Sequence, residues 1–158
     1  MRVRHQHYKY EGLRTTARGV IINDDKILLI ERWRPGLHYY SIPGGGIDED
    51  EDSSHTVVRE ICEETTLEIT VNKLLYDLTE ATEGHKHYIY LCNFISGTPS
   101  LPSDSEEFQA GSNNRFKPAW VDIKKLPELY FGYWEPIKQF LIDDLKNGFK
   151  DNVKITSF

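Results

Sequence analysis

The sequence predicts an α/β (α+β) fold in which a mixed β-sheet lies between helices. Strand-like patterns alternate with two helical patterns, and the first half of the chain is rich in strand patterns. No repeat, linker or low-complexity tract divides the 158 residues, and 39% of them are hydrophobic, which suffices for a core. We therefore expect a single domain over residues 1–158, with flexible ends at 1–12 and 149–158.

The individual elements follow from hydrophobic periodicity and turn signals. Apolar runs and alternations predict strands at residues 16–22, 27–33, 39–42, 67–78, 87–95 and 116–122. Helical patterns occupy residues 53–65, where serines at the start favour capping, and 133–146. Residues 23–25 (Asn-Asp-Asp) favour a turn, whereas 43–46 (Pro-Gly-Gly-Gly) are expected to interrupt regular structure. Residues 96–114 form a polar loop in this interpretation.

Composition and charge exclude several classes of function. The net charge is −6, residues 48–52 are all acidic, and no basic stripe is present, which argues against non-specific binding to nucleic acid or to a membrane surface. No apolar run approaches the about 18 residues that would span a bilayer, and residues 1–12 do not resemble a secretory signal. Cys62 and Cys92 form neither a disulfide framework nor a metal-ligand spacing, so we expect a cytoplasmic protein.

Three glutamates of the first predicted helix share one face. At about 100° per residue, Glu60, Glu63 and Glu64 fall within an arc of roughly 100°. Like charges at this spacing repel each other, and only Arg59 is placed to pair with Glu63 one turn away. Either this face is simply solvated, or it holds a cation that prefers hard oxygen ligands, such as magnesium, manganese or calcium.

The residues around this acidic face favour the second interpretation. The glycines at 44–46 allow the backbone to approach an ion or a phosphate closely, and the carbonyl of Gly44 offers a further hard ligand. Val58 and Ile61 project to the adjacent side of the helix, where we expect them to dock on the sheet. A glycine segment that leads into a carboxylate helix is suited to holding metal ions against a pyrophosphate.

The segment from Gly45 to Leu67 resembles the Nudix box of the Nudix hydrolase family. The box consists of Gly, five residues, Glu, seven residues and then Arg-Glu-U-x-Glu-Glu-x-Gly-U, where U is a bulky aliphatic residue. The matching residues are Gly45, Glu51, Arg59, Glu60, Ile61, Glu63, Glu64 and Leu67. The looser resemblance covers residues 13–146 and implies the Nudix fold. Thr66 departs from the pattern, because the family has a glycine there, which suits a left-handed residue at a helix end.

This resemblance implies metal-dependent hydrolysis of the pyrophosphate linkage in a nucleoside diphosphate attached to a moiety X. The implied cofactor is Mg²⁺, for which Mn²⁺ can substitute. The implied metal ligands are Gly44, Glu60, Glu63 and Glu64. The implied catalytic residues are Glu63, Glu60, Arg59 and Glu107, and Glu106 is an alternative to Glu107 in the same loop. Gly45 and Glu51 are structural positions of the motif; Glu51 would stabilise the junction of loop and helix.

Candidate substrate contacts lie outside the box. Arg14 and Arg18 alternate onto the same strand face as Thr16, where an arginine can hold a phosphate through two hydrogen bonds. Arg34 is a further candidate, and Tyr40 is suited to stacking on a base. The alternatives are surface arginines and an ordinary packed tyrosine.

Other residues carry weaker signals. His85 and His87 alternate onto one face of a predicted strand, but no third soft ligand is near them in the sequence, so we do not expect a zinc site. Trp120, Trp134 and Phe140 are most simply core or helix-docking residues.

Several functional alternatives remain open at the level of sequence. A Nudix-fold module that senses a nucleotide without cleaving it would have lost box glutamates, which this chain retains. A calcium-binding loop of the EF-hand type does not fit the acidic run, and an isomerase on a related fold would need a reactive group such as Cys92. The identity of X is open: oxidised purine triphosphates, ADP-ribose, other nucleotide sugars and dinucleoside polyphosphates are candidates. ADP-ribose is disfavoured because a proline typical of those enzymes is missing after the box. Homodimerisation is also open.

Overall fold

A computed structural model describes residues 13–100 and 114–158. The strands are β1 (Thr15–Asn23), β2 (Lys26–Arg34), β3 (Leu37–Ser41), β4 (Gly44–Gly46), β5 (Glu68–Thr79), β6 (Lys86–Ser96), β7 (Arg115–Asp122) and β8 (Lys154–Ser157). The α-helices are α1 (Ser53–Thr65) and α2 (Glu135–Asn147), and two 3₁₀ turns, η2 (Ile123–Glu128) and η3 (Gly132–Trp134), precede α2. Within the described residues, no helix combines the length and apolar character that crossing a membrane requires.

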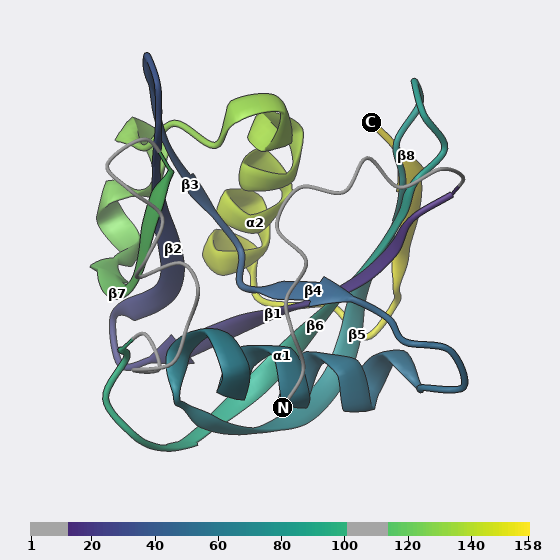
Figure 1. Cartoon of the computed structure of the whole chain (residues 1–158), viewed down its shortest axis with the longest axis horizontal. Helices are drawn as coiled ribbons and strands as arrows, with labels where there is room; N and C mark the ends of the chain where they lie inside the picture. Colours follow the sequence, from purple (N-terminus) through teal and green to yellow (C-terminus); the bar gives the residue numbers. More distant parts are fainter. Residues whose placement is uncertain (1–12, 101–113) are drawn as a thin grey trace.

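The sheet is mixed and lies between two helices. In the described part of the chain it has eight strands, in the order β3-β2-β1-β6-β5-β8, with β4 beside β1 and β7 beside β2. The pairs β1–β6 and β5–β8 are parallel, and the remaining pairs are antiparallel. Helix α1 lies below the central strands in Figure 1, and α2 lies above them. This arrangement confirms the predicted fold class.

Alternate residues of β1 feed two separate hydrophobic cores. Val20 packs on the α2 side, in a cluster that includes Trp134 and Leu141, whereas Ala17 and Ile21 pack on the α1 side. Because successive residues of a strand point to opposite faces, β1 contributes apolar side chains to both faces of the sheet, and a helix covers each face.

The prediction that Val58 docks on the sheet is wrong. Val57 and Ile61 are both 0% exposed and pack under β1, whereas Val58 is 36% exposed. The reason is the helical period, because residues four apart share one face, so that Val57 lies beside Ile61 and Val58 turns away.

Two segments acquire strand structure through pairing that is distant in sequence. Residues 44–46, expected to interrupt regular structure, form β4, which pairs with β1 in the register Thr16↔Gly46. The end at 149–158, expected to be flexible, contains β8, which pairs in parallel with β5. Strand formation depends more on a hydrogen-bonding neighbour than on local propensity. Pairing with β1 and with β5 therefore explains why these two segments are strands.

Helix α1 ends at Thr66 in the left-handed conformation that a glycine would adopt more easily. Thr66 has φ 63° and ψ 8°, and its N–H donates to the carbonyl of Cys62 at 2.9 Å. Its hydroxyl donates to the carbonyl of Thr98 at 3.1 Å and lies 3.1 Å from Oγ of Ser100. The helix therefore ends where the family pattern would end it, and the strain of a β-branched residue is tolerated.

Candidate active site

Two carboxylates of α1 are buried against the glycine strand β4. Glu60 is 8% exposed and Glu64 is 5% exposed. The backbone N–H of Gly44 donates to Oε2 of Glu64 at 3.3 Å. A Cβ on Gly45 would lie 2.6 Å from the carboxyl carbon of Glu60, so only glycine leaves that carboxylate in place. The absence of side chains in β4 is therefore what allows the helix to present these groups.

The backbone N–H of Gly44 points away from β1. The N–H of Gly19 donates to the carbonyl of Pro43 at 2.9 Å, so these two residues form a hydrogen-bonded pair of the antiparallel ladder. The next pair, Arg18↔Gly44, is then a non-hydrogen-bonded pair. The N–H of Gly44 accordingly takes no part in the ladder with β1 and donates to Glu64.

Arg59 is the centre of an ion-pair network with four carboxylates. Its Nε and Nη2 donate to both oxygens of Glu51, at 2.8 and 2.7 Å. Its Nη1 donates to Glu60 at 2.9 Å and to Glu63 at 3.3 Å, and Nη2 lies 3.4 Å from Asp48. The hydrogen bond with Glu51, followed by the charges of Glu60 and Glu63, raises the pKa of Arg59 above its ordinary value. Arg59 thus fixes the orientation of several carboxylates at once.

Glu51 ties the loop before α1 to the helix itself. Besides its bonds with Arg59, its Oε1 accepts from the hydroxyl of Thr56 at 2.6 Å and from the backbone N–H of Asp48 at 3.2 Å. Asp52 at the helix start makes no side-chain capping bond, so Glu51 supplies the polar contacts at this junction.

The donor set on this face fits a divalent cation. Several carboxylates gather here around one arginine, Arg59. Carboxylate and carbonyl oxygens are the ligands that Mg²⁺, Mn²⁺ and Ca²⁺ prefer. Gly44, Glu60, Glu63 and Glu64 offer such oxygens from adjacent positions of β4 and α1.

Arg18 lies on the α2 side of β1, next to this acidic group. Its Nη1 donates to the carbonyl of Ile42 at 3.0 Å, and its guanidinium carbon lies 4.7 Å from the ring centre of Trp134. Burial, and after it the charge of Arg14, lowers the pKa of Arg18 to about 10, while Glu64 opposes that shift. The side chain therefore stays charged at neutral pH. Its Nε is buried and has no acceptor among the described residues.

The sequence model of the NUDIX domain family matches residues 13–141 of this chain. The chain belongs to the Nudix hydrolase family. An ADP-ribose pyrophosphatase of Methanocaldococcus jannaschii is 32% identical over 131 residues, which cover 82% of this chain and 73% of that protein.

Solved structures show the same Nudix fold. A Nudix hydrolase from Nitrosomonas europaea superposes with a TM-score of 0.71 at 12% identity, covering 94% of this chain and 80% of the other. An ADP-ribose pyrophosphatase from Streptococcus suis superposes with a TM-score of 0.64 at 19% identity, covering 92% of this chain and 98% of the other. At these identities the likeness concerns the fold alone.

The structure gathers some of the predicted substrate residues of this Nudix hydrolase. Arg14 lies close enough to Arg18 and His87 to lower the pKa of both groups. Arg32 is a residue that the sequence analysis missed: it also lowers the pKa of Arg18, and its guanidinium carbon lies 5.1 Å from the ring centre of Phe116. The alternation of side chains along β2 did not single out Arg32 as a site residue. Arg32 approaches Arg18 only because of how β2 and β1 diverge in space.

Arg34 and Tyr40 lie elsewhere in the sheet. Arg34 pairs with Leu37 beside the β2–β3 turn, and its guanidinium carbon lies 6.0 Å from the ring centre of Tyr39. Tyr40 is half-buried and packs against the core on the α2 side. Burial and the adjacent Glu31 raise the pKa of Tyr40, which is the environment of a packed tyrosine. Glu106 and Glu107 lie outside the described residues.

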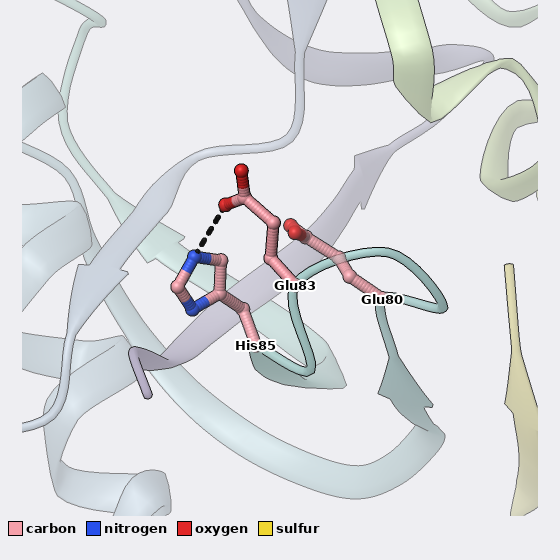
Figure 2. A group of neighbouring side chains, drawn as sticks. All are labelled: Glu80, Glu83 and His85. Atoms are coloured by element: carbon pink, nitrogen blue, oxygen red, sulfur yellow. Dashed lines mark hydrogen bonds and ion pairs between the residues drawn. The ribbon is translucent and has the colours of Figure 1, made fainter. Parts of the chain in front are cut away.

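A second group of polar side chains surrounds the β5–β6 turn. Figure 2 shows Glu83 and His85 in contact, with Glu80 beside them, and the ligand atoms of all three lie within 4.8 Å of one another. Nδ1 of His85 accepts from the backbone N–H of Arg14 at 2.9 Å. The ring proton therefore resides on Nε2, which donates to Glu83 at 2.8 Å. A metal on that nitrogen would have to displace this proton, so the group is a poorer metal site than the face of α1.

The cysteine considered for an isomerase is not suited to that chemistry. Cys92 is 4% exposed and packs in the core on the α1 side. Burial raises the pKa of its thiol to about 12, so the thiolate form is negligible at neutral pH.

Proposed function

We propose that this Nudix hydrolase uses divalent metal ions, Mg²⁺ in the first place, to cleave the pyrophosphate linkage of a nucleoside diphosphate attached to a moiety X. The observation that carries the proposal is the buried pair Glu60 and Glu64, which α1 presents to β4 beside the charged Arg18. Negative ligands for cations thus lie next to a positive group for phosphate, which is the charge pattern that a metal-bound pyrophosphate requires.

In this proposal, Gly44, Glu60, Glu63 and Glu64 hold the metal ions. When bound, the ions neutralise phosphate charge and lower the pKa of a coordinated water. Arg59 keeps Glu60 and Glu63 in fixed orientations through bonds of 2.9 and 3.3 Å. Gly45 leaves room for the carboxylate of Glu60.

Glu63 is proposed as the group that takes a proton from the attacking water. Its side chain is 33% exposed, compared with 10% for that of Glu60, so it has the better access to solvent. A metal ligand and a base are alternative roles for one carboxylate. Glu107 stays a second candidate for the base from its place in the sequence.

Arg18 is proposed to bind a phosphate of the substrate. A guanidinium has five N–H donors, and within residues 13–100 and 114–158 the side chain of Arg18 makes one hydrogen bond, to Ile42. Its positive charge at neutral pH suits a phosphate oxygen, and Arg14 adds positive charge nearby. Arg34 and Tyr40 are not part of this site as proposed.

ADP-ribose is the first substrate to test. The relative of known activity that matches 82% of this chain is named an ADP-ribose pyrophosphatase. The missing proline that disfavoured ADP-ribose concerns a single position, whereas the similarity extends over 131 residues. We therefore place ADP-ribose ahead of other nucleotide sugars, dinucleoside polyphosphates and oxidised purine triphosphates.

The test is product release from each of these compounds with and without Mg²⁺, for the wild type, Glu63→Gln and Glu68→Gln. Glu68 is an exposed carboxylate at the start of β5 and serves as the matched control. We expect Mg²⁺-dependent turnover that falls by about 10²–10⁴-fold in Glu63→Gln and is unchanged in Glu68→Gln. Binding without turnover in either metal, Mg²⁺ or Mn²⁺, would instead support a nucleotide sensor.

A further inference from the structure

Trp134 contacts both Arg18 and a buried histidine. Its ring centre is 4.7 Å from the guanidinium carbon of Arg18 and 4.8 Å from the ring centre of His87, and the two rings meet at 61°. Phe158 packs on Trp134 at 5.9 Å. Trp134 is only 6% exposed, so its ring is fixed by these neighbours rather than by solvent.

His87 is itself fixed at both ring nitrogens. Burial, and then the charges of Arg18 and Arg14, lowers the pKa of His87 to about 3, so the ring is neutral at physiological pH. The neutral ring donates through Nε2 to Glu80 at 2.7 Å, and Nδ1 accepts from the hydroxyl of Thr16 at 2.6 Å. A neutral, doubly bonded ring supports Trp134 without placing a further positive charge near Arg18.

Glu80 connects this support to the β5–β6 turn and to η3. It is 8% exposed, and besides His87 it accepts from the hydroxyl of Tyr133 at 3.5 Å. Figure 2 shows Glu80 within the turn, apart from the contact between Glu83 and His85. Through these hydrogen bonds, Glu80 connects β6, which carries His87, with η3, which carries Tyr133 and Trp134.

In the described part of the chain, Arg18 has few polar contacts of its own that would hold it in place. An arginine side chain has several rotatable bonds, and an unsupported guanidinium loses that freedom when it binds a ligand. The aromatic face of Trp134 attracts the cation without accepting a conventional hydrogen bond, so this contact does not consume the N–H donors of Arg18. Tryptophan is the side chain that provides this attraction best.

We propose that Trp134 is a positioning residue, which, together with the adjoining His87, holds the guanidinium of Arg18 ready for a substrate phosphate. The inference rests on the proposed function, in which Arg18 binds that phosphate. It assigns to Trp134 a role beyond core packing, and it links the β5–β6 turn to substrate affinity.

The test is calorimetric binding of α,β-methylene-ADP, a non-hydrolysable diphosphate, in the presence of Mg²⁺. The variants are Arg18→Ala, Trp134→Leu and the double variant, with Trp134→Phe as the conservative change. We expect Trp134→Leu to raise Kd about tenfold in the wild-type background and to have no effect in the Arg18→Ala background. Trp134→Phe should recover part of the affinity, because a phenyl ring retains a weaker attraction for the cation.

Phe131→Leu is the control for loss of an aromatic core residue. Phe131 is 2% exposed, precedes η3 and packs in the same core as Trp134. We expect it to lower the thermal midpoint while leaving Kd unchanged. With a hydrolysable substrate, Trp134→Phe should raise KM with little change in kcat, which general destabilisation would not produce.

The outcomes separate the two proposals. If Arg18→Ala weakens binding but Trp134→Leu and Trp134→Phe do not, Trp134 is only a core residue. Equal weakening by Trp134→Leu with and without Arg18 would also overturn the positioning role. If Arg18→Ala leaves Kd unchanged, the phosphate-binding role of Arg18 fails, and the positioning role fails with it. Should Trp134→Leu not fold, the same comparison is made with Trp134→Phe in both backgrounds.

Discussion

Replacing Gly45 by alanine tests whether β4, which carries no side chains, positions the carboxylate of Glu60, a proposed metal ligand. A Cβ at this position would lie 2.6 Å from the carboxyl carbon and from Oε2 of Glu60. Carbon atoms ordinarily approach to about 3.5 Å, so the carboxylate has to move by about 0.9 Å. The adjacent Gly46→Ala is a matched control, because a Cβ there meets nothing within 4 Å.

The two variants should differ in activity far more than in stability. The obstructing atoms belong to the end of a flexible side chain, so Glu60 yields without displacing the backbone, and we expect unfolding free energies within about 1 kcal/mol of each other. A displacement of about 1 Å at a reacting centre lowers turnover by about 10²-fold. Steady-state hydrolysis measures kcat/KM for both variants, and calorimetry measures their Mg²⁺ affinity.

The reasoning has a clear point of failure. If Gly45→Ala retains kcat/KM within about threefold of Gly46→Ala, then Glu60 is not held by the absence of a side chain in β4. If Gly46→Ala loses activity to the same extent, the requirement lies in the backbone of the whole strand rather than in the contact with Glu60.

Three further predictions concern stability. Thr66→Gly and Thr66→Ala both lose the hydroxyl bonds of Thr66, but only glycine relieves the left-handed φ of 63°. The unfolding free energy of Thr66→Gly should therefore exceed that of Thr66→Ala by about 1 kcal/mol, which their thermal midpoints check. The pKa of His87 is about 3, below its ordinary value, so the stability that its neutral ring contributes is present above pH 6.5 and is lost as the pH falls towards 3. Urea unfolding should show that the free energy of unfolding differs less between pH 7 and pH 5 in His87→Gln than in the wild type. An equal difference in the two proteins would contradict this prediction. Arg59→Lys keeps the positive charge but loses the two parallel hydrogen bonds to Glu51. Calorimetric unfolding should show that the free energy of unfolding falls by about 2 kcal/mol, and an unchanged thermal midpoint would refute this prediction.

The acidic face of the site was readable from the sequence because it is local. Glu60, Glu63 and Glu64 lie on one helix, so the helical period alone places them together, and Arg59 reaches Glu63 at 3.3 Å as its spacing requires. The same period separates Val57 from Val58, and there the prediction failed because both are apolar and adjacent. Which of two neighbouring valines docks depends on how the helix is rotated on the sheet.

Other features depend on contacts between residues far apart in the chain. Residues 44–46 form a strand only because β1 offers a hydrogen-bonding edge, and β8 forms only beside β5. Trp134 looked like a core residue in the sequence, and its contact with Arg18 spans more than a hundred positions. Neither composition nor periodicity predicts a contact between two residues so far apart in the chain.

The sequence by itself determined the family, the fold class and the set of carboxylates, because motif spacing and helical periodicity act within a few turns of chain. Only the tertiary structure decided that Glu60 and Glu64 are buried against β4, that His87 is neutral, and that Arg18 lies on Trp134. These properties arise from burial and from neighbouring charges, and both are set by segments that meet only when the sheet has assembled.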